Sequence, residues 1–181
     1  MARKTLRRLG RGAVVLVASA SLAFTGAHVA NAAYYAGGMK TQSFCVKNPS
    51  VNDTWLAPLN NGRNKWNSRS AFPGNISVFS GCPNLLKVGT YSGDWLGIYY
   101  PLIPGSQYEI NLNSPKLNAH VKATGGNFAN VVTSTTAHEF GHALKLHDIQ
   151  SPNNRLMSHN RNRTIQVGPN AVEITESNGY Y

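Results

Sequence analysis

The sequence predicts a single α+β domain in which a twisted, mostly five-stranded sheet packs against helices. Three observations lead to this prediction. The chain has 181 residues, which is enough for one hydrophobic core and too few for two comfortable domains. Short segments of alternating polar and apolar side chains, a pattern typical of half-buried strands, recur between Lys40 and Leu112. A long helical run and a shorter final helix follow them.

The first two expected elements are a strand and a helix. Residues Lys40–Lys47 (KTQSFCVK) alternate well enough for a strand. Leu59, Gly62 and Trp66 then recur at helical spacing. They predict a helix over Pro58–Ser70, with the proline tolerated in its first turn.

Four more strands are expected before the next helix. Each is rich in aliphatic, β-branched or aromatic side chains and is bounded by turn residues. They cover Asn75–Phe79, Leu85–Tyr91, Trp95–Tyr100 and Tyr108–Leu112.

Two helices are expected in the C-terminal part. The glycine pair at 125 and 126 breaks the chain, and a long helical run follows at Thr133–Leu146. The last helix is expected at Pro169–Asn178. Its proline at the first position and Gly179 just past its end are the usual asymmetry of helix ends.

The N-terminus has the pattern of a secretory signal. Residues Met1–Arg11 carry five basic side chains and no acid, Ala13–Phe24 is apolar, and Ala30-Asn31-Ala32 is a small-x-small cleavage site. The apolar stretch is shorter than the ~20 residues of a membrane-spanning helix. We therefore predict a signal peptide at 1–32, a catalytic domain at 33–181, an extracellular, secreted location and no stable membrane insertion. A retained membrane anchor is the alternative.

The charge balance gives no support to nucleic acid as a partner. The chain carries 17 Lys and Arg residues against 7 Asp and Glu residues. Five of the basic residues belong to the signal, which leaves the domain with a mild net charge of +5. Because the sequence shows no basic helix and no nucleic-acid-binding motif, we expect no such partner.

The two cysteines, Cys45 and Cys82, are predicted to form one disulfide. An even pair of cysteines in an exported chain is typical of a disulfide. Closing a loop of this length would stabilise the fold by about 3–4 kcal/mol. The alternative is that Cys45 caps a metal as a thiolate.

Residues 138–148 read HEFGHALKLHD, and they are the main candidates for chemistry. On a helix, His138 and His142 lie on one face, one turn apart, where two imidazoles can bind a zinc ion. Glu139 lies off the ion but close enough to a coordinated water to act as its general base. The alternatives are an amphipathic helix with incidental histidines, or a capping box in which Thr136 begins the helix.

This segment resembles the metzincin signature HExxHxxGxxH, in the variant with aspartate as the third zinc ligand. The triplet around Met157 resembles the methionine turn of that clan of zinc peptidases, and the chain looks nearest to small secreted bacterial members such as the snapalysin-like peptidases. The resemblance covers about Lys40–Tyr181. It implies Asp148 as the third ligand and a zincin-like fold with an active-site helix, an irregular C-terminal half and a final helix.

The sequence departs from that signature at Lys145, which stands where the pattern has a glycine with positive φ. A lysine in that conformation costs on the order of 1 kcal/mol. If the helix runs further instead, His147 rather than Asp148 would meet the metal, and both are good zinc ligands. The motif position favours Asp148.

Other residues receive roles from the same resemblance. His159 lies where several metzincins have a tyrosine, so it is expected to stabilise the transition state, with a solvated loop histidine as the alternative. The cleft is expected to be bordered by an edge strand that pairs with peptide substrate, although edge strands exist without ligands. That strand comprises Leu96, Gly97, Ile98 and Tyr99. Arg161 and Arg163 are interpreted as surface charge, with a preference for acidic substrates as the alternative.

The function expected from these residues is that of a secreted, zinc-dependent endopeptidase. Zinc would activate a water, and Glu139 would take its proton as it attacks a peptide bond. The partners expected are a protein or peptide substrate, and the chain is expected to be a monomer. The alternative is a secreted, non-catalytic binding or adhesion module that keeps the fold. The segment Ala33–Met39 carries no cysteine or acid, so we expect it to leave the metal site open.

Overall fold

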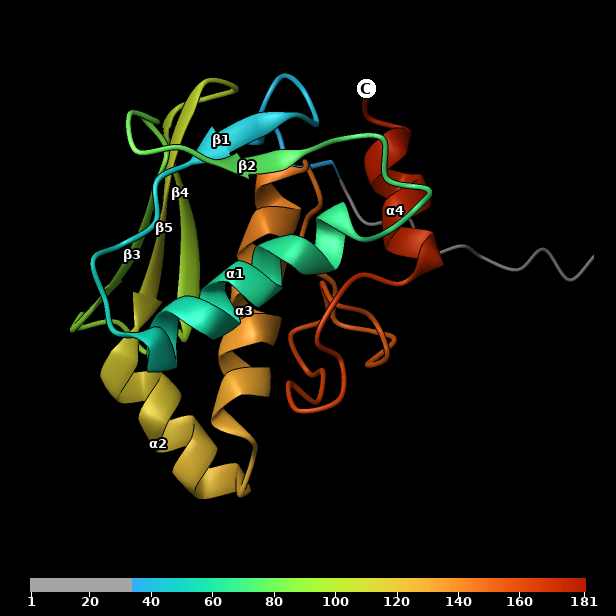
Figure 1. The fold of residues 1–181 in the computed structure, drawn as a ribbon. Helices are drawn as coiled ribbons and strands as arrows, with labels where there is room; N and C mark the ends of the chain where they lie inside the picture. The colour runs from blue at the N-terminus through green and yellow to red at the C-terminus, as the bar shows by residue number, and fades with distance from the viewer. Residues whose placement is uncertain (1–33) are drawn as a thin grey trace, which may run out of the picture. The chain divides into compact units, whose positions relative to one another are not determined.

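The computed structural model describes residues 34–181, which belong to one compact unit of the chain (Figure 1). The expected signal peptide at 1–32 lies outside the described residues. Among residues 34–181, none of the helices combines the length and the apolar character that a membrane crossing needs.

The larger of two sheets has three strands in the order β3-β5-β4. Strand β3 (Leu85–Gly89) is parallel to β5 (Gln107–Asn113), and β4 (Gly97–Ile103) is antiparallel to it. One face of β5 is fully buried through Tyr108, Ile110 and Leu112, so β5 is the centre of the sheet. Strand β4 forms one of its edges.

The remaining two strands form a separate small sheet, so the expectation of a single five-stranded sheet is wrong. Strands β1 (Phe44–Val46) and β2 (Ile76–Val78) pair in parallel with each other. An isolated bridge between Lys47 and Leu85 joins β1 to the larger sheet. Strand alternation in a sequence predicts that strands exist but does not determine which of them pair.

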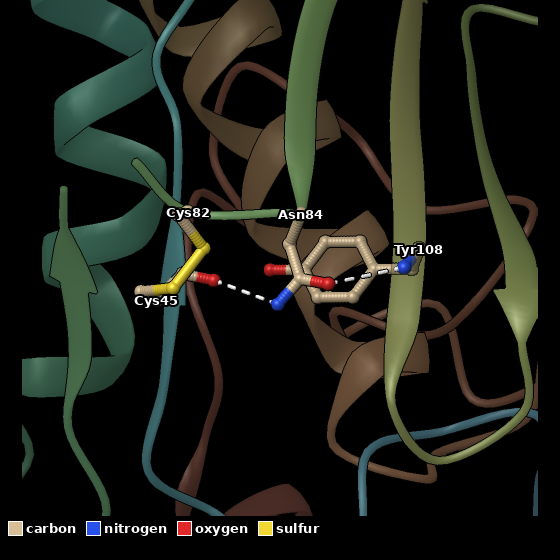
Figure 2. Close-up of a disulfide and its surroundings, with 4 residues drawn as sticks. All are labelled: Cys45, Cys82, Asn84 and Tyr108. Atoms are coloured by element: carbon tan, nitrogen blue, oxygen red, sulfur yellow. Dashed lines mark hydrogen bonds between the residues drawn. A yellow bond between two sulfur atoms is a disulfide. The ribbon is translucent and has the colours of Figure 1, made fainter. Parts of the chain in front are cut away.

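The side chain of Asn84 lies at the junction of the two sheets (Figure 2). Its Nδ2 donates a hydrogen bond to the carbonyl of Cys45 at 3.0 Å, and its Oδ1 accepts one from the backbone N–H of Tyr108 at 3.1 Å. A side-chain amide thus satisfies backbone groups at a point where continuous strand pairing would otherwise do so. Asn84 itself is 2% exposed, so these bonds are shielded from water.

Helix α3 (Phe128–Ala143) is the central element of the domain, and α1 (Asp53–Asn67) crosses it (Figure 1). Every residue of α3 from position 131 to its end is buried. Two of its polar side chains are satisfied within the helix, since Thr135 and Thr136 donate to the carbonyls four residues back. The Trp66 indole of α1 donates to the carbonyl of Ala137 at 2.8 Å.

The close crossing of these helices requires Gly62. A Cβ atom there would lie 2.6 Å from Cβ of Thr136 and 2.9 Å from the carbonyl oxygen of Thr133. The expected helix at Pro58–Ser70 is therefore real but begins five residues earlier than predicted, so Pro58 lies inside it. The carbonyl of Pro58 accepts a hydrogen bond from the Thr133 hydroxyl at 3.2 Å.

Helix α2 (Ser114–Thr124) was not expected from the sequence. Leu117 is its one buried residue, so it shows little of the hydrophobic periodicity on which helix prediction depends. The local signals are nonetheless present: Pro115 lies in its first turn, and Gly125 ends it in the left-handed conformation with φ of 62°.

The final helix α4 (Ala171–Asn178) falls within the range expected for it. Asn170 and Glu173 form a reciprocal capping box at its start. Glu173 is fully buried, and its Oε1 also accepts a hydrogen bond from the backbone N–H of Met157 at 2.8 Å. Helix α4 is thereby attached to the loop that lies beneath the candidate site.

Candidate metal centre

The candidate site is built where α3 ends and the chain turns back on itself. His138, Glu139 and His142 lie in the last turns of α3. Lys145 then adopts φ of 68°, the left-handed conformation expected at this position. The turn is closed by a hydrogen bond from Leu146 N–H to the carbonyl of Gly141 at 2.9 Å, and it returns the chain towards the helix.

This turn brings three side chains together around one point. Nε2 of His138 lies 3.0 Å from Oδ1 of Asp148, and Nε2 of His142 lies 3.7 Å from Oδ2 of the same carboxylate. The three residues each offer one ligand atom, and these atoms lie within 4.8 Å of one another. Two nitrogens and one carboxylate oxygen are donors that zinc accepts readily.

In both histidines, the tautomer leaves Nε2, the nitrogen that faces the cluster, free to bind a metal. Nδ1 of His138 lies 2.9 Å from the carbonyl oxygen of Leu156, and Nδ1 of His142 lies 2.8 Å from that of Leu146. A carbonyl only accepts, so each Nδ1 carries the proton and each Nε2 of the neutral ring presents a lone pair. Burial lowers the pKa of His138 to about 3, which keeps this ring neutral.

The carboxylate of Asp148 supplies the best test of whether a cation fits. About a quarter of its side chain, 27%, remains exposed to solvent, so the carboxylate is ionised at neutral pH. Its Oδ1 is buried and has no hydrogen-bond partner among the described residues. An ionised oxygen 3.0 Å from an unprotonated nitrogen leaves two lone pairs facing each other. That arrangement is favourable only around a cation, so the residues fit a divalent metal.

His147 is placed differently from its neighbour. Its Nδ1 lies 3.0 Å from the backbone carbonyl oxygen of Asp148, and its ring is exposed. His159 is nearer to the centre, since its Nε2 lies 3.5 Å from Oδ2 of Asp148 while half of its side chain remains exposed. The structure thus gathers His138, His142 and Asp148 and leaves His147 outside the cluster.

Glu139 lies in the same cleft with its carboxylate removed from water. Burial raises its pKa to about 8, although Arg161 and a backbone hydrogen bond from Tyr99 act in the opposite direction. Strand β4 passes very near, because a Cβ atom on Gly97 would lie 2.7 Å from Oε1 of Glu139. The four residues expected on the edge strand all line the cleft: Leu96, Gly97, Ile98 and Tyr99.

Met157 lies beneath the helix that carries the histidines. It is fully buried, and a side chain on Gly141 would clash with its sulfur. The N–H of Met157 donates to Glu173, so this residue connects the helix that carries the histidines to α4.

The cleft has a volume of about 360 Å³, and Tyr35 is one of the residues that line it. The ring of Tyr35 lies 5.4 Å from that of His142, although the segment around it carries no recognisable motif. Backbone pairing places it there, since Tyr35 N–H donates to the carbonyl of Lys145 at 2.8 Å. Arg161 and Arg163 also line the cleft, and Arg161 is only 4% exposed, so its interpretation as surface charge is wrong.

The predicted disulfide between Cys45 and Cys82 is present, with Cα atoms 5.9 Å apart (Figure 2). It excludes the alternative in which Cys45 caps a metal as a thiolate. A structural disulfide is typical of proteins that fold outside the reducing cytosol, which is consistent with an extracellular protein.

Comparison with known proteins finds similarity in fold alone. No protein-family model matches the chain, and no curated protein matches it. A chain from a solved structure described as the "GM1 bound form of the ECX AB5 holotoxin" is similar, with a TM-score of 0.60 and 12% sequence identity. The match covers 81% of this chain and 86% of that chain.

These findings correct the family expectation. The similar structure is described as a toxin and not as a metzincin, and no family model supports the metzincin or snapalysin-like assignment. The zincin-like fold with one five-stranded sheet and the descriptions protease and metalloprotease, all taken from that resemblance, do not stand as assignments. The physical reason is that a motif of eleven residues constrains one helix end and its turn, not the architecture of the whole chain. The chemistry of the site is therefore argued from its own residues.

Proposed function

We propose that the chain is a secreted protein that binds zinc through His138, His142 and Asp148 and hydrolyses peptide bonds in its cleft. One observation carries the proposal: the ligand atoms of His138, His142 and Asp148 converge, with no proton between them, in the cleft that also holds the buried carboxylate of Glu139. Two histidines and one carboxylate, with Nδ1 of each imidazole held by a backbone carbonyl, are typical of a catalytic zinc site.

A bound zinc ion would polarise a substrate carbonyl and lower the pKa of a coordinated water. The protein's own contribution centres on Glu139, whose carboxylate faces the cleft with a pKa of about 8 in the absence of metal. It would accept a proton from the attacking water and pass it to the leaving nitrogen. The edge of β4 offers backbone groups along which an extended peptide could lie.

The test is a casein digestion with purified residues 33–181, with and without a chelator, alongside zinc analysis. We expect one zinc per chain, chelator-sensitive hydrolysis, and a Glu139→Gln variant that keeps its zinc but loses activity by several orders of magnitude. If the variant keeps more than about a tenth of the wild-type activity, Glu139 is not the base. If the wild-type chain binds no zinc, the proposal fails.

A second function, a secreted binding module without turnover, is favoured by the comparison. The similar chain belongs to a structure whose description names binding of GM1 and assembly into a holotoxin, and it does not mention hydrolysis. Under this function the target would be an extracellular glycolipid or a partner chain, and the protein need not be a monomer.

Vesicles with and without GM1 test this second function directly. Co-sedimentation with the GM1 vesicles alone, unchanged by a chelator and by Glu139→Gln, would support a binding module. Equal sedimentation with both vesicles would count against it. Light scattering of the purified chain would show whether it assembles.

A further inference from the structure

Two arginines form a cationic wall of the cleft close to the metal cluster. Arg161 is held rigidly, since one guanidinium nitrogen donates to the carbonyl of Ser158 at 2.9 Å and its Nε donates to the hydroxyl of Ser134 at 3.2 Å. Burial lowers the pKa of Arg161 most, and Arg163 lies near enough to lower it further. Two like charges this close, one buried and the other half-buried, are unfavourable unless an anion joins them.

Glu139 and Asp148 in the same cleft attract both arginines and raise their pKa values, but neither carboxylate pairs directly with them. Within residues 34–181, no ion pair joins either arginine to a carboxylate, and Nε of Arg163 is buried without a hydrogen-bond partner. Three carboxylates line the cleft, and each has another role. Asp94 pairs with Lys116, Asp148 belongs to the metal cluster, and Glu139 is hydrogen-bonded to strand β4.

The arginines also have space around them. A second cavity of about 320 Å³ is lined by Arg161 and Arg163 together with His120, Thr124 and Thr164, and by no acidic residue. Because both arginines line this cavity and the metal cleft, the two spaces share one wall. A side chain reaching from a peptide in the cleft would meet the guanidinium of Arg163 there.

We propose that Arg163, supported by Arg161, binds the carboxylate of an acidic side chain in the peptide substrate and so determines specificity. A guanidinium matches a carboxylate through two parallel hydrogen bonds, which a neutral amide cannot reproduce. The inference rests on the proposed peptide hydrolysis and deepens it, because it names glutamate or aspartate near the cleaved bond.

Matched peptides test the preference. Fluorogenic peptides with amidated C-termini would carry Glu or Gln at successive positions around the cleaved bond. At one position we expect kcat/KM to favour Glu by about tenfold, the size of a charge-assisted hydrogen bond. Arg163→Gln should bring this ratio near one, and Arg163→Lys should restore part of it. Arg69→Gln, which removes an exposed arginine outside both cavities, should leave the ratio unchanged.

A binding measurement separates this inference from the proposed function. In chelator, N-acetyl-glutamate amide at millimolar concentration should shift the Nε–H resonance of Arg163, and N-acetyl-glutamine amide should not. Such a shift without any peptide cleavage would support the proposed subsite at Arg163 and contradict the proposed peptide hydrolysis. Peptide cleavage with neither a preference for Glu nor a shift would contradict the proposed subsite and support the proposed hydrolysis. A preference only for peptides with a free C-terminal carboxylate would overturn the assignment to a side chain.

Discussion

The buried carboxylate of Glu139 affects stability as well as chemistry. Its pKa is about 8 in the folded, metal-free protein and near the ordinary glutamate value of 4.5 in the unfolded chain. Between these values the folded state binds more protons than the unfolded state, so stability falls as pH rises from about 4.5 to 8. Burial is the largest cause of the raised pKa, and the charge of Arg161 offsets it only in part.

Glu139→Gln should remove this pH dependence in the metal-free protein. In chelator, we expect the variant to melt higher than the wild type, with a gap that widens by several degrees from pH 5 to pH 8. Calorimetry across that range measures it. A gap that is constant with pH would mean that Glu139 ionises normally.

Single substitutions also distinguish the two adjacent candidates for the third zinc ligand, His147 and Asp148. Asp148→Ala removes the ionised oxygen of the cluster, whereas His147→Ala removes a ring that lies outside it. We expect the aspartate variant to lose zinc affinity by at least about a hundredfold and the histidine variant by less than about tenfold. Competition titration with a zinc-binding dye measures both. The reverse order would show that the turn after α3 is wrongly placed.

At the scale of an element, the turn that follows α3 combines strain with compensation. Lys145 has a φ of 68°, which favours glycine. Its Nζ lies 4.0 Å from the ring centroid of Tyr181 and 3.2 Å from the carbonyl oxygen of Tyr180. The contacts of the lysine side chain with the end of the chain thus offset the strain in its backbone.

Two substitutions separate these effects. Lys145→Ala keeps the strain and loses the contacts, whereas Lys145→Gly loses the contacts but relieves the strain. We therefore expect the glycine variant to be more stable than the alanine variant by about 1 kcal/mol, and close to the wild type. Urea unfolding of the three proteins tests this. Equal stability of the two variants would show that the turn is unstrained.

The sequence predicted the elements that carry strong local signals. The spacing of His138 and His142 placed both on one helix face, and the motif position of Lys145 favoured the turn over a longer helix. Helix α2 was missed because it buries only Leu117. The pairing of strands was missed because the junction depends on the side chain of Asn84, a long-range contact without a local pattern. Arg161 was misread for a similar reason, since its burial comes from hydrogen bonds to distant Ser134 and nearby Ser158.

At the scale of the whole molecule, the disulfide joins parts that the sheets connect only weakly. It links β1 to the segment before β3, close to the isolated bridge between the two sheets. We expect Cys45→Ser with Cys82→Ser to lower the free energy of unfolding by about 3–4 kcal/mol. The zinc affinity of the folded variant should change little, because the metal cluster lies on α3 and its following turn. Denaturant unfolding and a zinc titration together measure the two effects. A large loss of zinc affinity would mean that the sheet junction supports the site.

The carboxylate of Glu173 connects the end of the chain to the metal site by thermodynamic linkage. It caps α4 and also accepts the hydrogen bond of Met157 N–H, directly after Leu156, whose carbonyl orients His138. Whatever stabilises one partner must stabilise the other by the same free energy. Zinc should therefore slow hydrogen–deuterium exchange in Ala171–Asn178, although no residue of α4 belongs to the cluster. Glu173→Gln should weaken this protection, and unchanged exchange on adding zinc would show that helix and site open independently.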